Sequence, residues 1–164
     1  PSVGVKVEPQ LYLSESLTLT GKVLYQRFRE WLLWDYPTQQ LAAFEADRYV
    51  MDLGINWYPS SKQEVRVKFQ WAAVSADAVD GYRLSESGDL VESGTAVSDF
   101  SLSDTVLQIR YRYELAPLSN IYLVYNRGGF FFSDEHGDSP WELIQEGWRE
   151  KQVETIILKI RYRF

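Results

Sequence analysis

The residue best suited to acid–base chemistry in this chain is its single histidine, His136, in the segment SDEHGDSPWE. Ser133, Asp134 and Ser139 lie close to it in sequence, so a hydrolase would have to build its site here. A catalytic triad needs groups that converge from separate elements, and neighbours on one loop do not meet that condition. We therefore expect His136 to be an exposed loop residue and the chain not to be an enzyme.

Acidic side chains around the same histidine offer oxygen ligands for a cation such as Ca²⁺. Asp134, Glu135 and Asp138 are close together, but their spacing does not fit an EF-hand loop. The chain has no Cys, which excludes thiolate zinc sites, disulfides and cysteine catalysis. The pair Gly128-Gly129 stands alone and does not make a phosphate-binding loop. The sequence predicts no metal site and no cofactor.

Charged residues recur at every second position in three segments. They are Glu64, Arg66 and Lys68, then Arg110, Arg112 and Glu114, then Lys159, Arg161 and Arg163. This period of two places the charged side chains on one face of a β-strand and the intervening apolar residues on the other. We interpret the charged residues as the wall of a polar interior. Two roles stay open for them: cross-strand ion pairing that holds the wall together, and an electric field, or paired arginines, that attract anions.

Seven segments show this alternation and predict the elements that must position these residues. They are 3–13, 17–28, 49–57, 64–73, 105–115, 121–128 and 153–164. The connections 14–16, 59–62 and 116–120 are short, whereas 33–46, 75–100 and 131–150 are long, with one helical turn expected at 141–148. Because short and long connections alternate, all short turns lie at one end, as in outer-membrane barrels. The predicted fold is all-β, an antiparallel up-and-down transmembrane β-barrel.

Aromatic residues make up 15% of the chain, and many are predicted at the two ends of the strands. Those near the short turns are Trp57, Tyr58, Tyr111, Tyr113, Tyr162 and Phe164, and those near the long connections include Trp31 and Trp34. Two belts of rings around an aliphatic band are typical of the two lipid–water interfaces of a membrane barrel. The net charge of −6 argues against a nucleic-acid partner. Because the strands are basic, the acidic residues must gather in the long loops.

The C-terminal sequence ETIILKIRYRF, with Tyr162 and Phe164, resembles the signal that the barrel-assembly machinery recognises on outer-membrane barrels. The segments INWYPSSKQEVRVKFQW (55–71), LQIRYRYELAPLSNIYLVYNRGG (107–129) and ILKIRYRF (157–164) resemble the C-terminal barrel portion of a family of uncharacterised bacterial outer-membrane proteins. Longer members of that family begin with a domain like a carbohydrate-binding module. The resemblance implies an outer-membrane location, with the C-terminus periplasmic and the long loops extracellular, and it implies no reaction.

These features predict one barrel segment over residues 1–164. Bacterial single-chain barrels have an even number of strands, so seven strands suggest the C-terminal part of a larger barrel. We expect a channel or transporter with a basic interior wall and acidic extracellular loops. The alternative is a non-transporting anchor or scaffold of a larger surface or secretion complex, and a soluble ligand-binding barrel ranks third. The expected partners are outer-membrane lipid, the assembly machinery, and a protein bound at the loops or at an N-terminal part.

Overall fold

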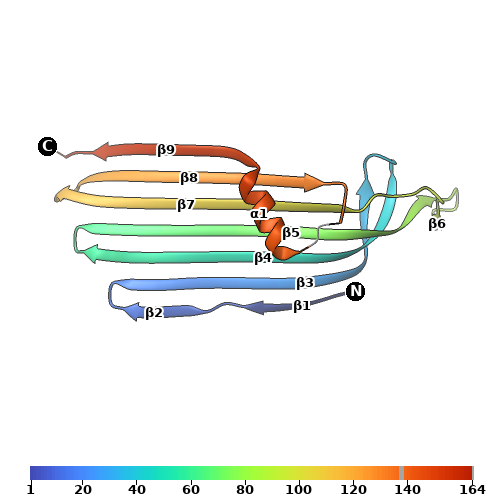
Figure 1. The fold of residues 1–164 in the computed structure, drawn as a ribbon, viewed down its shortest axis with the longest axis horizontal. Helices are drawn as coiled ribbons and strands as arrows, with labels where there is room; N and C mark the ends of the chain where they lie inside the picture. Colours follow the sequence, from blue (N-terminus) through green and yellow to red (C-terminus); the bar gives the residue numbers. More distant parts are fainter. Residues whose placement is uncertain (137–138, 164) are drawn as a thin grey trace.

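A computed structural model describes residues 1–136 and 139–163. Its elements are β1 (Ser2–Val7), β2 (Gln10–Ser14), β3 (Leu17–Asp35), β4 (Gln40–Ser60), β5 (Gln63–Leu84), β6 (Leu90–Glu92), β7 (Phe100–Ala116), β8 (Ser119–Ser133), α1 (Pro140–Arg149) and β9 (Lys151–Arg161). All strands belong to one sheet, which is longest along the strand direction (Figure 1). No helix in the described residues has the length and apolar character that a membrane crossing requires.

The sheet follows the order β1-β3-β4-β5-β7-β8-β9, with β2 beside β3 and β6 beside β5. Every pairing is antiparallel, so the predicted all-β, up-and-down antiparallel architecture is confirmed. The sheet is not closed into a barrel, because β1 and β9 lie at opposite edges (Figure 1). These two edge strands run in the same direction, so they could not complete the antiparallel pattern by pairing with each other.

The predicted strand 3–13 is divided into β1 and β2 at Pro9. Proline lacks the N–H that a strand interior needs, so it interrupts the ladder at this edge. The carbonyl of Pro9 still accepts a hydrogen bond from the backbone N–H of Gly21, at 2.9 Å. Both pieces pair with β3 and together occupy one position in the sheet, which therefore has the seven positions that the alternation predicts.

The long connection predicted at 33–46 is wrong. Strand β3 continues to Asp35 and β4 begins at Gln40, which leaves a turn of residues 36–39. Strand β5 likewise runs on to Leu84, within the connection predicted at 75–100. Ala42, Ala43 and Phe44 are all buried, so this part of β4 is covered on both faces. A strand covered on both faces loses the alternation by which the other strands were recognised.

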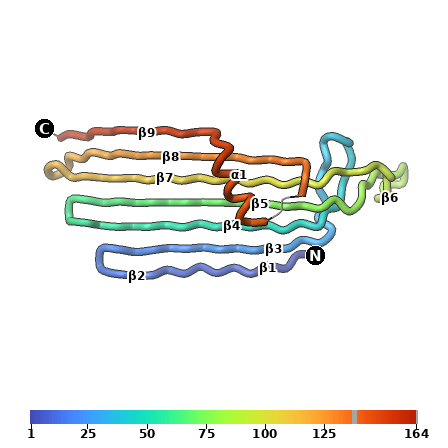
Figure 2. The backbone as a smooth tube through the Cα atoms, in the orientation of Figure 1, coloured from blue at the N-terminus to red at the C-terminus, as the bar shows by residue number. Residues whose placement is uncertain are grey.

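The outer part of the β3–β4 hairpin bends sharply away from the long axis of the sheet and turns across the ends of β5 and β7 (Figure 2). The bend coincides with a register shift after Phe28 and a left-handed residue, Glu30, with φ of 55°. Phe44 meets Phe100 of β7 edge to face, with ring centroids 5.1 Å apart. The residues packed in this cluster are Phe28, Trp31, Leu33, Ala42, Phe44, Ala46, Val74, Ala76, Ala78, Val97, Phe100 and Leu102.

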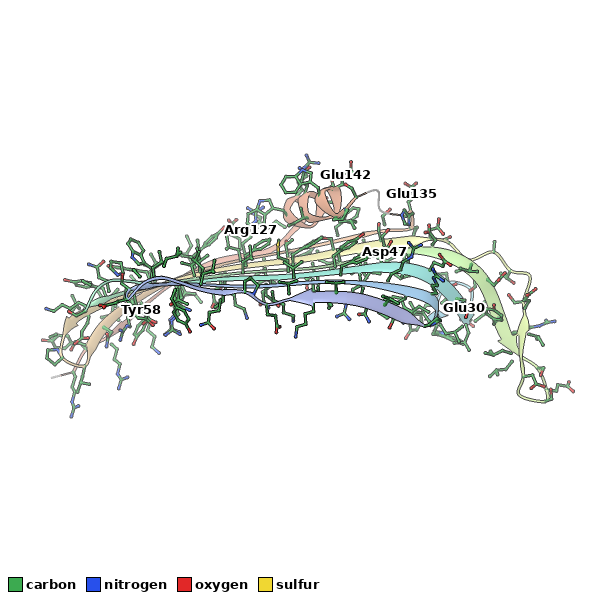
Figure 3. All side chains as sticks on the ribbon, turned by 90° about the horizontal axis from the view of Figure 1, so that it is seen from below. Glu30, Asp47, Tyr58, Arg127, Glu135 and Glu142 are labelled. Atoms are coloured by element: carbon green, nitrogen blue, oxygen red, sulfur yellow. The ribbon has the colours of Figure 1, made fainter. Side chains whose placement is uncertain are left out.

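Helix α1 lies against the opposite face of the sheet, over β5, β7 and β8 (Figures 1 and 3). The predicted single turn at 141–148 is a helix of ten residues, capped by the Ser139 hydroxyl, which accepts from the backbone N–H of Glu142 at 3.3 Å. Leu143 of the helix is buried against Trp71 and Ala73. In the edge-on view of Figure 3 the sheet bows away from α1 towards both ends, so α1 is on the convex side.

Candidate functional site

The predicted charged residues lie together on one face, which we call the basic face. Register pairs share a face, and Glu64 pairs with Arg112 while Arg66 pairs with Arg110. The other predicted members occupy the same face: Lys68 opposite Gln108, Glu114 and Arg161 each opposite Asn120, and Lys159 opposite Tyr122. Arg163 follows Arg161 beyond the end of β9, and its backbone N–H donates to the Ser119 hydroxyl at 3.1 Å.

Two carboxylates of the basic face, those of Glu64 and Asp52, are engaged by close cations. Glu64, only 8% exposed, lies between the guanidinium groups of Arg66 and Arg112, with Arg112 Nε 3.0 Å from Glu64 Oε2. Asp52 is 3.4 Å from Lys22 Nζ and accepts a hydrogen bond of 2.7 Å from Gln70. The cross-strand pairing that was left open for this wall therefore occurs at Glu64.

Other cations of this face have no carboxylate within ion-pair distance among the described residues. They include Lys68, Arg110, Lys159 and Arg161. The Arg110 guanidinium lies over the ring of Tyr122, 5.5 Å from its centroid, so its position is partly fixed by a cation–π contact. The half of the basic face nearer the short β2–β3, β4–β5 and β7–β8 turns, which we call the turn-end half, consequently carries an excess of positive charge.

Two open hollows lie side by side on this half of the face. One, of about 370 Å³, includes in its lining the cations Lys22, Arg66, Lys68 and Arg110 and the carboxylate of Asp52, which Lys22 engages. The second, of about 340 Å³, includes Arg110, Lys159 and Arg161. Gln108 and Arg110 line both hollows, so Arg110 stands between the two.

The opposite side, which we call the apolar face, carries aliphatic and aromatic side chains on all seven sheet positions, half-buried on β5 and exposed on the other six. Its exposed residues include Val3, Val5, Val7, Val23, Leu53, Ile55, Trp57, Ile109, Leu123, Ile156, Leu158, Ile160 and Tyr162. The register aligns them in rows, such as Leu19, Ile55, Val67 and Ile109. This face lies back to back with the charged residues at the same height along the strands.

The predicted belt near the short turns is divided between the faces. Four of its residues share register rows or strand parity with aliphatic residues and therefore belong to the apolar face: Trp57, Tyr111, Tyr113 and Tyr162. Tyr58 belongs to the basic face, where its hydroxyl group interacts with Arg66. Phe164 lies outside the described residues.

The residues predicted for the second belt are elsewhere. Trp31 stacks on Phe28 at 5.0 Å in the cluster under the bent hairpin, on the basic face, and Trp34 is an exposed residue of the hairpin tip. The rings that border the apolar face towards the loop end are Tyr25, Tyr49 and Trp71, which follow one another at centroid distances of 5.4 Å and 5.9 Å. Their position depends on the register, which the alternation alone does not supply.

The loop-end border of the apolar face runs obliquely to the strands. Along the apolar face from the turn end to the loop end, the first charged pair on β3 and β4 is Arg27–Asp47. On β8 and β9 the first charged pair is Arg127–Glu154. On β8, the residue in the row of Asp47 is Ser133, so Arg127 lies about 20 Å nearer the turn end at the usual rise per residue. Over the five strand spacings from β3 to β9 the border therefore makes an angle of about 40° with the perpendicular to the strands.

The turn end is displaced in the same sense. Leu17, next to the β2–β3 turn, shares a row with Trp57, Val65 and Tyr111. Strand β7 continues beyond Tyr111 to Ala116 before it turns, and Figure 1 shows successive turns reaching further out from β3 to β8. The apolar face is therefore an oblique band with both borders slanted alike.

Two tyrosines mark the loop-end border by reaching towards its carboxylates. Tyr25 donates to Asp47 and Tyr125 donates to Glu154, each at 2.7 Å. Each ring is therefore joined to the apolar band at one end and to a charged group at the other, the arrangement typical of tyrosine at an apolar–aqueous boundary.

The structure brings His136 to two residues of β5 that lie far from it in sequence. His136 Nδ1 is 2.9 Å from Asp77 Oδ1 and 3.2 Å from Ser75 Oγ. Ser75 Oγ is also 3.5 Å from His136 Nε2, but Ser75 is only 4% exposed, whereas the nucleophile of a catalytic triad must be accessible to its substrate. The grouping ties the segment before α1 to the sheet, and sequence proximity had pointed to Ser133, Asp134 and Ser139 in place of these partners.

Acidic groups collect at the loop end. Desolvation raises the pKa of Tyr82, and the carboxylates of Asp80, Glu92 and Glu30 raise it further. Within residues 1–136 and 139–163, no group of three or more His, Asp or Glu side chains is arranged to hold a metal ion. Asp138, one of the three oxygen donors considered for Ca²⁺, lies outside the described residues.

Comparison of the chain with protein-family models, with curated proteins and with solved structures gives no match.

Proposed function

We propose that this chain is a membrane-embedded sheet of a bacterial outer-membrane channel or transporter. The observation that carries the proposal is an apolar face that spans all seven sheet positions, back to back with the charged residues of the basic face at the same height. Lipid would contact the apolar face, and the basic face would line an aqueous interior. A one-sided apolar surface of this extent is unusual for a protein surrounded by water.

The dimensions of the apolar band support lipid as its cover. From Leu17 to Tyr25, β3 advances about 27 Å, which is close to the height of the apolar band of outer-membrane barrels. The slant of about 40° matches the tilt of strands in such barrels. No charged side chain lies on the apolar face between the two borders in the described strands, whereas charged side chains of the basic face occupy the alternating positions at the same height.

Helix α1 fits this arrangement because it lies at the loop-end border. It covers Ser103, Thr105 and Gly129. These residues are on β7 and β8, where the slanted border lies nearer the turn end than it does on β3 and β4. The polar side chains of α1 would therefore be at the extracellular interface, with the acidic loops. The proposal retains a periplasmic C-terminus, insertion by the assembly machinery through Tyr162 and Phe164, and closure of the barrel by further antiparallel strands.

One observation favours the second candidate, a membrane anchor or scaffold without transport. The bent hairpin of β3 and β4 packs on the basic face through Phe44 and Phe100, so it would narrow the interior at the loop end. If it closes the interior, the barrel serves to hold the loops and a partner at the cell surface.

Two adjacent residues of β8 offer a matched test of the membrane proposal. Leu123 lies on the apolar face and Val124 on the basic face. We expect Leu123→Arg to reduce folding into phospholipid vesicles, because an arginine in the middle of a lipid-facing band costs about 2–4 kcal/mol. Val124→Arg should insert like the original chain. Insertion is measured by protease protection and heat-modifiable gel mobility, and equal insertion of both variants would contradict the assignment of the faces.

Conductance of the full-length protein in planar bilayers distinguishes the two candidates. A channel gives steps with an anion preference, and Arg110→Glu together with Arg161→Glu should weaken or reverse that preference. Inserted protein without conductance would support the scaffold. An unchanged reversal potential in the double variant would remove the basic face from the conduction path.

A further inference from the structure

Two carboxylates of the basic face already have partners within the protein, and other cations of this face have no carboxylate partner in the described part of the chain. Glu64 forms ion pairs with Arg66 and Arg112. Asp52 forms an ion pair with Lys22 and accepts a hydrogen bond from Gln70. The remaining cations line the two hollows, and none has a carboxylate within ion-pair distance among the described residues. An anionic ligand would therefore meet cations that need not first give up a protein partner.

From this arrangement we infer that the two hollows form one binding site for small polyanions, solutes that carry at least two phosphate or carboxylate groups. Guanidinium and ammonium groups are the side chains that bind such oxyanions most strongly. Arg110 lines both hollows and would contact the ligand at its centre. The inference deepens the proposed function, on which it rests for its biological meaning, by naming the class of solute that the interior takes.

The distance between the outer cations explains why two anionic groups are needed. Lys68 is on β5 and Lys159 on β9, three strand spacings apart and four residues apart along the strands, which together correspond to about 20 Å. A single oxyanion cannot contact both. A ligand with a second anionic group can place one group beside Lys68 and the other beside Lys159, with Arg110 shared between them. Tyr122, beneath Arg110, keeps the guanidinium over the sheet, between the two hollows.

The experiment is titration calorimetry of the full chain in detergent micelles, with tripolyphosphate and orthophosphate as probes. We expect tripolyphosphate to bind more tightly. Arg110→Gln should weaken its binding about tenfold, the effect of losing a charged hydrogen bond. Lys159→Gln should reduce the preference for tripolyphosphate over orthophosphate. The control is Arg83→Gln, which removes the same charge from an exposed position of β5 that lines neither hollow and should leave binding unchanged.

The possible outcomes separate this inference from the proposed function. Equal losses in Arg110→Gln and Arg83→Gln, or no preference for tripolyphosphate, would overturn the site, since binding would then reflect only overall charge. Vesicle insertion is measured on the same samples. A chain that inserts but does not bind tripolyphosphate keeps the membrane proposal and loses the polyanion site. A chain that binds tripolyphosphate but does not insert keeps the site and loses the membrane proposal.

Discussion

The contact between α1 and the sheet depends on single residues that have little or no side chain. A Cβ on Gly129 would overlap the carbonyl oxygen of Gly147, and one on Gly147 would lie 2.5 Å from Ser103 Oγ. This close approach lets the Thr105 hydroxyl donate to the Gly147 carbonyl at 2.9 Å. Arg127 adds a hydrogen bond of 2.9 Å to the Trp148 carbonyl and lies 4.1 Å from the centroid of its ring.

Gly129→Ala should therefore release α1 without unfolding the sheet. The new methyl group meets backbone that cannot move aside, and overpacking of this kind costs about 1–3 kcal/mol. We expect faster hydrogen exchange of the α1 amides. The adjacent Gly128→Ala is the control, because the nearest atom to its new methyl group is Val153 Cγ1 at 3.0 Å, a side-chain end on an edge strand that can rotate. Exchange in α1 that is no faster in Gly129→Ala than in Gly128→Ala would refute the contact.

The face of each charged residue was predictable from the sequence, whereas its partners were not. Parity within one strand places Arg66 and Lys68 together, but the pairing of Glu64 with Arg112 depends on the register between β5 and β7. The same parity could have corrected one prediction. Trp57 and Tyr58 are adjacent in a strand, so they cannot both face lipid. The contact of His136 with β5 had no local signal.

At the scale of elements, strands were found where one face is exposed and missed where both are covered. Residues 100–105 read FSLSDT, and serine at alternate positions predicts a loop. In the structure Ser101, Ser103 and Thr105 are buried because α1 needs small residues beneath it. The bent hairpin covers the other face of the same strands. The loop end thus has two covering elements, which hid its strands from the sequence pattern.

Phe44→Ala should release the bent hairpin. Phe44 is 3% exposed and holds the hairpin against Phe100, and removing a buried phenylalanine side chain costs about 3–5 kcal/mol. We expect faster limited proteolysis in the 36–39 turn, with the turn-end half of the sheet unchanged. Phe130→Ala provides the comparison, since Phe130 is 46% exposed and should have little effect. Equal cleavage rates in the two variants would show that the cluster does not hold the hairpin down.

At the scale of the whole molecule, the sheet has two unpaired edges in its described part. Strands β1 and β9 run in the same direction, as the arrows in Figure 1 show, because seven positions lie in an alternating sheet. An antiparallel barrel closes only when the number of positions is even. A strand of opposite direction between β9 and β1 would satisfy both edges, and it would leave the apolar face outside and the basic face inside.

Spin labels at Val5→Cys and Ile156→Cys test whether the chain closes on itself, and the absence of native Cys makes the labelling specific. The two residues lie on the apolar face of the edge strands, six spacings apart and offset by six residues along the strands, so an open or shallowly curved sheet separates them by roughly 35 Å. Measured in vesicles, with labelled chain diluted into unlabelled chain to exclude contacts between copies, the distance should stay well above about 15 Å. A shorter distance would mean that β1 and β9 meet in a parallel seam, so that these strands suffice to close the cylinder. A long distance that persists after insertion means that lipid alone cannot bring the edges together, so the interior of the channel needs strands from outside residues 1–164.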